Sequence, residues 1–185
     1  MKNIKYLLTI IILVITSCNF IPSEPKQETE LQNYKLMLGE FNLEELKATK
    51  NEDWFDISYK EYSPNLETLE KLKSEVEKEN FQIEIYVGTW CPDSQREFPQ
   101  LIKLLDQINF DMNNLRLVGV DRDKVVPKLS EAERKSLNIS NVPTIIVLDK
   151  NGKELNRYVE FAQESLEEDL LKILSKQDYK HVYNL

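Results

Sequence analysis

One cysteine in the middle of this chain stands where a buried strand passes into an amphipathic helix. Residues 81–87 (FQIEIYV) have the apolar character of a strand, and Cys91 follows closely. The helix after it is indicated by apolar residues at helical spacing: Phe98, Leu101, Ile102, Leu105 and Ile108. Pro92 takes the first helical position, where a missing N–H costs nothing. Because a helix N-terminus favours an anion, we expect it to favour the thiolate of Cys91, the form that attacks disulfides.

The residues around Cys91 are mostly polar, so we expect its thiol to be partly exposed and reactive. The alternative is a structural cysteine, which normally lies in apolar surroundings. Asp93 adds a nearby negative charge that opposes thiolate formation. Arg96 either offsets that charge or is simply solvated, and we favour the solvated state. Trp90 is expected to shield the sulfur and to shape the contact surface.

Composition narrows the function classes. The chain has 185 residues, 41% of them hydrophobic and 30% charged, which is typical of one globular domain with extensions. The formal net charge of −8 argues against a nucleic-acid partner, which needs a basic face. His181 is the single histidine, so a metal site built on histidines is not expected. We predict neither a metal nor a cofactor.

The N-terminus has the pattern of a secretory signal. Lys2 and Lys5 precede an apolar run at 6–15, about ten residues long, whereas a spanning helix needs roughly 20. Residues 15–18 (ITSC) resemble the lipobox of bacterial lipoproteins, and this resemblance implies cleavage before Cys18 and its lipidation. The alternative is an ordinary signal peptide with an incidental cysteine. We expect a signal peptide at 1–17 and an extracytoplasmic protein, lipid-anchored to a bacterial membrane and facing the periplasm or the cell surface.

Residues 18–80 are expected to connect the anchor to the domain. The lipidated cysteine and a polar, proline-containing stretch make 18–30 a flexible tether. Residues 31–80 are predicted to form a helical extension, with Asn42 and Asn65 as helix caps. The aromatic segment 53–62 either packs the extension onto the core or walls a substrate groove. We favour packing, because aromatic side chains dominate core energetics.

The segments after the cysteine alternate between strands and helices. We expect a strand at 115–120, a short helix opened by the capping box Ser130-x-x-Glu133, and a buried strand at 145–148. Asn151-Gly152 predicts a hairpin turn into an antiparallel strand at 154–159. A last helix begins after Ser165. The predicted order from residue 81 is β–α–β–α–β–β–α.

This order, with the motifs placed on it, resembles the thioredoxin fold over about 81–175. Residues 90–94 (WCPDS) are similar to the family's Trp-Cys-x-x-Cys stretch, and Pro99 falls where a proline kinks its active-site helix. Residues 142–144 (VPT) resemble the family's cis-proline loop. The resemblance implies a three-layer α/β/α sandwich with a mixed central sheet, here a domain at 81–185. It also implies that the loop lies against Cys91 and that the residue before Pro143 pairs with a substrate's backbone.

Two positions depart from the family. Ser94 replaces the second cysteine, so the mixed disulfide formed by Cys91 needs an external thiol to resolve it, although the Ser94 hydroxyl can hydrogen-bond the thiolate. Ile85 stands where the family often has a buried acid. Glu84 is adjacent, but a one-residue shift on a strand points to the opposite face, so we do not transfer the role to it.

The chain most resembles membrane-tethered, extracytoplasmic thioredoxin-like lipoproteins of bacteria. That resemblance implies thiol–disulfide exchange, as monothiol oxidoreductase or isomerase, with Cys91 and Ser94 as catalytic residues. The substrate-binding residues it implies are Trp90, Pro92, Val142 and Pro143. Its partners are cysteine-containing or disulfide-bonded envelope proteins, an external thiol reductant, and the membrane through lipid on Cys18.

Three other functions are alternatives to this one. The main alternative is a binding module that keeps the fold while redox chemistry has lapsed, which Ser94 and Ile85 favour. A thiol peroxidase is disfavoured, because Gly88 occupies the position where the peroxidase pattern has threonine. A copper carrier lacks the second cysteine and the nearby histidine that it needs. Of these functions we favour the enzyme, a thiol–disulfide oxidoreductase or isomerase of monothiol type, over the binding module.

Overall fold

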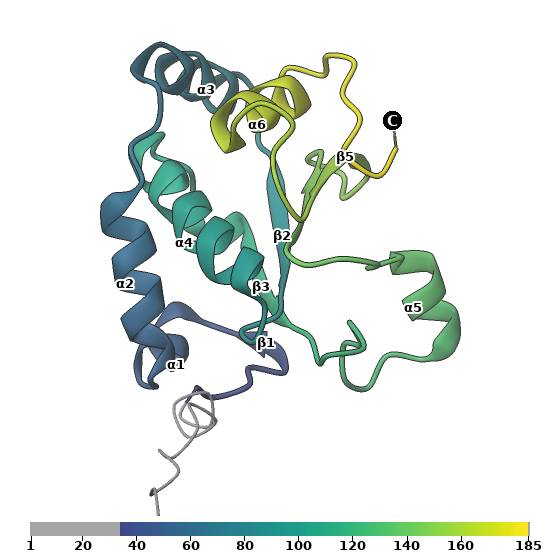
Figure 1. The fold of residues 1–185 in the computed structure, drawn as a ribbon. Helices are drawn as coiled ribbons and strands as arrows, with labels where there is room; N and C mark the ends of the chain where they lie inside the picture. Colours follow the sequence, from purple (N-terminus) through teal and green to yellow (C-terminus); the bar gives the residue numbers. More distant parts are fainter. Residues whose placement is uncertain (1–33, 185) are drawn as a thin grey trace, which may run out of the picture.

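A five-stranded mixed sheet organises the part of the chain that the computed structural model describes, residues 34–184 (Figure 1). The strands lie in the order β1-β3-β2-β4-β5, and only β2 and β3 run parallel to each other. Their bounds are Gly39–Phe41 (β1), Gln82–Val87 (β2), Leu115–Gly119 (β3), Thr144–Leu148 (β4) and Glu154–Val159 (β5). The predicted signal peptide, Cys18 and the tether to residue 30 lie outside the described residues.

Helices cover both faces of this sheet. One face carries α2, α4, α3 and α6, and α5 lies on the other (Figure 1). The bounds are Leu43–Lys47 (α1), Asn51–Glu61 (α2), Leu66–Lys78 (α3), Pro92–Gln107 (α4), Glu131–Leu137 (α5) and Leu166–Leu174 (α6), with a 3₁₀ helix η3 at Met112–Asn114. The order from β2 to α6 is the predicted one, and the mixed α/β sandwich is confirmed.

Local helix signals are confirmed at all four predicted N-termini. Asn42, Asn65, Ser130 and Ser165 each accept a hydrogen bond from a backbone N–H in the first turn of their helix. A cap of this kind contributes about 1 kcal/mol to helix stability. The capping-box glutamate at Ser130 is also in place, since the Glu133 carboxylate accepts from the Ser130 N–H at 2.8 Å.

The N-terminal extension contributes a strand that the sequence analysis did not predict. β1 pairs antiparallel with β3, with Gly39 opposite Gly119, and so forms one edge of the sheet. Gly119 allows this close approach, because a Cβ there would lie 2.2 Å from the carbonyl oxygen of Met37. The rest of the extension is helical, as expected. The domain boundary at residue 81 stays a prediction.

The aromatic segment of the extension packs into the core, as favoured from the sequence. Phe55 on α2 is buried, and its ring centroid lies 5.5 Å from that of Phe98 on α4 in an edge-on arrangement. The centroid of the Trp54 ring lies 6.5 Å from that of the same Phe98 ring. These contacts fix α2 against the helix that begins at Cys91, so the extension helps to position the site.

Candidate functional site

Cys91 is the N-cap residue of α4, at the junction with β2. Its backbone is extended (φ −96°, ψ 124°), and Pro92 takes the first helical position as predicted. The turn between strand and helix is closed by the Cys91 N–H, which donates to the Gly88 carbonyl at 2.8 Å. Because Pro92 has no N–H, the first backbone N–H of α4 is that of Asp93, two residues after Cys91.

The structure brings Cys91 against the loop that precedes β4. The Val142–Pro143 peptide bond is cis, as the family resemblance implied. The Cys91 thiol donates to the Val142 carbonyl oxygen, with Sγ and oxygen 3.4 Å apart. A second hydrogen bond fixes the loop, because the Glu160 N–H donates to the Pro143 carbonyl at 2.7 Å. Cys91, Val142 and Pro143 thus form one site, although 51 residues separate the thiol from its acceptor.

The predicted partial exposure of Cys91 is wrong. Only 8% of the residue is exposed, and it packs in an apolar cluster on the α5 face of the sheet. The other buried members of this cluster are Tyr86, Val118, Val120, Val126, Val142 and Ile146. Trp90 packs against the cluster from outside, and its indole N–H donates to the Val120 carbonyl at 3.2 Å. The polar neighbours in sequence gave the wrong expectation because the neighbours in space are apolar.

Arg96 is not simply solvated, contrary to the favoured prediction. One guanidinium nitrogen lies 2.8 Å from Asp93 Oδ1, and Nε lies 2.8 Å from Glu97 Oε1. The guanidinium therefore offsets the negative charge that Asp93 places near Cys91. The side chain of Arg96 is half exposed, so water weakens this effect.

Ser94 is fully buried, three residues after Cys91. Its hydroxyl oxygen accepts from the backbone N–H of Gly88 at 3.2 Å. Within residues 34–184 no hydrogen bond joins Ser94 to Cys91, and Cys91 is the one cysteine there. In this structure Ser94 thus supports the strand-to-helix turn, and a resolving thiol is absent from the described part of the chain.

Ile85, at the position where the family often has a buried acid, and the adjacent Glu84 lie on opposite faces of β2. Ile85 is buried in the core on the α4 side. Glu84 points to the other face, where it accepts from the Tyr86 hydroxyl at 2.6 Å and pairs with Arg116 at 3.1 Å. Burial and the hydrogen bond to Glu84 raise the pKa of Tyr86. This geometry agrees with the expectation that Glu84 does not act as the buried acid at Cys91.

The sequence analysis missed two polar residues that support the site. Glu97 on α4 is buried and accepts from the Tyr158 hydroxyl at 2.9 Å. Thr89, also buried, ties the turn before Cys91 to the N-terminal segment, because its hydroxyl oxygen accepts from the Met37 N–H at 3.2 Å. No local signal marks the burial of either residue, since Tyr158 and Met37 are both distant in sequence.

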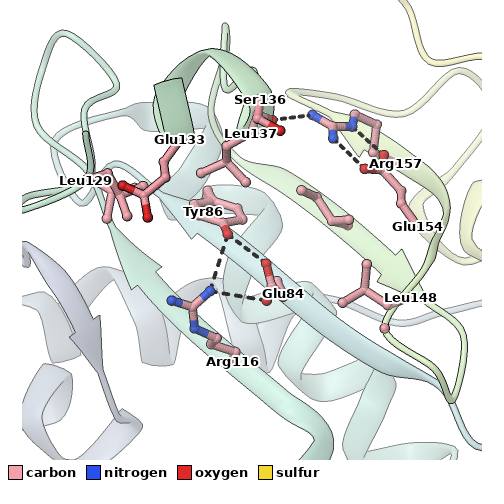
Figure 2. Close-up of a pocket in the computed structure, with 13 residues that line it drawn as sticks. Glu84, Tyr86, Arg116, Leu129, Glu133, Ser136, Leu137, Leu148, Glu154 and Arg157 are labelled. Carbon is pink, nitrogen blue, oxygen red and sulfur yellow. Dashed lines mark hydrogen bonds and ion pairs between the residues drawn. The ribbon is translucent and has the colours of Figure 1, made fainter. Parts of the chain in front are cut away.

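A cavity of about 450 Å³ lies between α5 and the sheet (Figure 2). Its polar groups largely pair with one another: Arg116 with Glu84 and Arg157 with Glu154, the latter at 2.6 Å. Arg157 also donates to the Leu137 carbonyl at 3.0 Å. No cysteine or histidine lines this cavity, so Cys91 is not part of it.

Among residues 34–184, no helix is long and apolar enough to cross a membrane. No group of three or more histidine, cysteine or acidic side chains is arranged there to hold a metal ion.

Comparisons with known proteins point to one fold. A family model described as thioredoxin matches residues 40–173. A crystal structure of a protein of unknown function from Pseudomonas aeruginosa is 16% identical, with a TM-score of 0.51 over 80% of this chain and 85% of that one. An HIV epitope scaffold is 16% identical, with a TM-score of 0.56 over 82% of this chain and 99% of that one. No curated protein matches the sequence. At 16% identity these solved structures support the fold alone.

Proposed function

This chain belongs to the thioredoxin family, and from that premise we propose that it acts in thiol–disulfide exchange through a single cysteine, Cys91. The observation that carries the proposal is the contact of 3.4 Å between Cys91 Sγ and the carbonyl oxygen of Val142, beside Pro143. Trp90 packs against the apolar cluster that contains Cys91, and Pro92 is exposed at the start of α4. A helix N-terminus supports a thiolate at Cys91.

The first step is attack by the Cys91 thiolate on one sulfur of a partner's disulfide. A bond forms between Cys91 Sγ and that sulfur, the partner's S–S bond breaks, and the second sulfur leaves as a thiolate that takes a proton from water. Loss of the thiol proton also removes the donor that Val142 O binds. That oxygen is then free to accept a backbone N–H of the partner lying along Val142–Pro143.

The second step needs a thiol from outside the chain. The hydroxyl of Ser94 cannot displace a sulfur, so an external thiolate attacks Cys91 Sγ and releases the partner with both its thiols reduced. A second external thiol then frees Cys91 and leaves as the disulfide of the two external thiols. When a different cysteine thiolate of the partner attacks the partner's sulfur in the mixed disulfide instead, a new disulfide forms within the partner, Cys91 leaves as a thiolate, and the result is isomerisation. The contribution we propose for Ser94 is to position the turn that carries Cys91.

We also propose that the protein works at a bacterial membrane, outside the cytoplasm. The support is the sequence of residues 1–18: a basic start, a short apolar run and a lipobox-like end at Cys18. Residues 18–30 then serve as a tether. The partners are envelope proteins with cysteines or disulfides, and no cofactor takes part.

The alternative is a redox-inactive binding module that binds partners along Val142–Pro143. The low exposure of Cys91 and the buried Ser94 favour it, because a buried thiol without a resolving partner reacts slowly. In that case a Cys91→Ser variant binds partners as well as the unaltered chain does.

The test is reduction of a protein disulfide by a small thiol, with the full chain carrying Cys18→Ser so that Cys91 is its only thiol. We expect a rate above the uncatalysed reaction and its loss in the additional Cys91→Ser variant. Circular dichroism checks that both proteins are folded. Equal rates for the two proteins would contradict the proposed exchange.

A further inference from the structure

A small cavity of about 110 Å³ opens beside the active-site turn, on the side of the N-terminal segment. It is lined by Tyr34, Leu36, Thr89, Trp90, Gln95 and Arg122. Trp90 also packs against the apolar cluster that contains Cys91, so the cavity adjoins the proposed reaction site. Leu36 is 41% exposed, which leaves an apolar wall open to a partner.

The wall formed by the N-terminal segment is fixed in place. The Thr89 hydroxyl donates to the Lys35 carbonyl and accepts from the Met37 N–H, both at 3.2 Å. The Asn51 amide donates to the same Lys35 carbonyl at 2.7 Å. Gly119 admits the Met37 backbone, as a Cβ at that position would clash with it. The shape of the cavity is therefore built by specific contacts.

A cation without an ion-pair partner among residues 34–184 lies at this cavity. The Arg122 guanidinium lies 5.4 Å from the centroid of the Trp90 ring, and the residue is exposed. Arg96 and Arg116 each pair with carboxylates, whereas no carboxylate within residues 34–184 forms an ion pair with Arg122. Arg122 is thus available to an acidic group of a bound partner.

We propose that this cavity is a specificity subsite, which takes a large aliphatic side chain near the partner's reacting cysteine, next to an acidic residue that pairs with Arg122. The inference rests on the proposed function. Trp90, the sequence neighbour of Cys91, lines the cavity and packs against the cluster that contains Cys91, so a partner bonded to Cys91 lies near the cavity. An apolar cavity of about 150 Å³ holds benzene, so a cavity of about 110 Å³ suits a leucine side chain better than a large ring.

The test uses peptides whose one cysteine is joined in a disulfide to mercaptoethanol. Leucine or serine is placed in turn at the first and second positions on either side of the cysteine, with aspartate or asparagine beside it. The full chain carrying Cys18→Ser is mixed with each peptide, and mass spectrometry follows the rate of adduct formation on Cys91. We expect one position at which leucine reacts about tenfold faster than serine.

Substitutions of residues in the cavity wall test whether the preference for leucine arises at the cavity. Leu36→Ser should abolish the preference for leucine. Leu38→Ser is the matched control, because Leu38 is 47% exposed on the same segment and does not line this cavity. Arg122→Gln should remove a gain of about threefold from aspartate, a gain that salt also weakens. Equal rates for leucine and serine peptides, or equal losses in Leu36→Ser and Leu38→Ser, would overturn the subsite.

A small disulfide separates this inference from the function on which it rests. Hydroxyethyl disulfide is too short to fill the cavity and reports the exchange at Cys91 alone. If Cys91 does not react with it, the proposed exchange fails. The same peptides with serine in place of cysteine are then titrated with the full chain by calorimetry. The subsite still requires tighter binding of the leucine peptide, lost in Leu36→Ser, and equal binding would overturn it.

Discussion

The hydroxyl oxygen of Ser94 lies 3.2 Å from the backbone nitrogen of Gly88 and accepts its hydrogen bond where β2 passes into α4. Ser94 is buried three residues after Cys91, at the position where the family has its second thiol. A second thiol can therefore be restored at position 94, on the same helix turn as Cys91. This relationship gives the first prediction.

Ser94→Cys should raise the turnover of disulfide reduction by at least about tenfold, because an intramolecular thiolate replaces a slower external one. The measurement is reduction of insulin by dithiothreitol, followed by turbidity. Ser94→Ala is the control: it also alters the contact with Gly88 but adds no thiol, and it should not gain activity. No difference between the cysteine and alanine variants would count against the proposed site.

Tyr158→Phe should destabilise the fold by about 2–3 kcal/mol, because it removes the donor of a buried, charged acceptor, Glu97. The matched control is Tyr59→Phe, whose hydroxyl bonds Asp106 at 2.7 Å near the surface and whose loss should cost about 1 kcal/mol or less. Urea unfolding gives both free energies. Equal costs would show that burial of the Tyr158–Glu97 pair adds nothing.

The fold should lose stability in alkali through its tyrosines. The hydrogen bond to Asp106, with burial, raises the pKa of Tyr59 to about 12. Burial, with a carboxylate partner, likewise raises the pKa of Tyr62, Tyr158 and Tyr179. Unfolded tyrosines titrate near pH 10, so the stabilisation is complete below about pH 10.

Above that pH the unfolded chain releases protons that the folded chain keeps. The free energy of unfolding should therefore fall as the pH rises from about 10 through 12. Urea titrations at intervals from pH 8 upward measure it, and tyrosinate absorbance reports ionisation in the native protein. A stability that stays constant while unfolded tyrosine ionises would refute this assignment.

Cys18→Ser should abolish lipid attachment and membrane retention in a bacterial host. The measurement is labelling with an alkyne-tagged fatty acid, followed by fractionation of the cells. The unaltered chain should carry label and sediment with membranes, whereas the variant should do neither. Cys91→Ser is the control that must keep both properties. Label on the Cys18→Ser chain would place the lipid elsewhere.

Local signals in the sequence were sufficient for much of the fold. The capping residues Asn42, Asn65, Ser130 and Ser165 mark helix starts by contacts within three residues, so they can be recognised without tertiary structure. The apolar face of α4 follows from its spacing. β1 escaped prediction because it has three residues and depends on its pairing with β3, which lies far along the chain.

The environment of the site could not be predicted in the same way. Burial of Cys91 depends on Val142, and burial of Glu97 depends on Tyr158, 61 residues away. The ion pair of Arg96 with Asp93 is local, but surface pairs of this kind are weak enough that the sequence does not decide between pairing and solvation.

The reactivity of Cys91 in the folded chain, compared with the unfolded chain, tests the central claim most directly. The full chain with Cys18→Ser is reacted with hydroxyethyl disulfide at one pH, native and in urea, and adduct formation is timed by mass spectrometry. Our account predicts faster reaction in the folded protein despite an exposure of 8%, because Cys91 is the N-cap residue of α4 and a helix N-terminus favours an anion. Slower reaction in the folded protein would contradict it and favour the binding module.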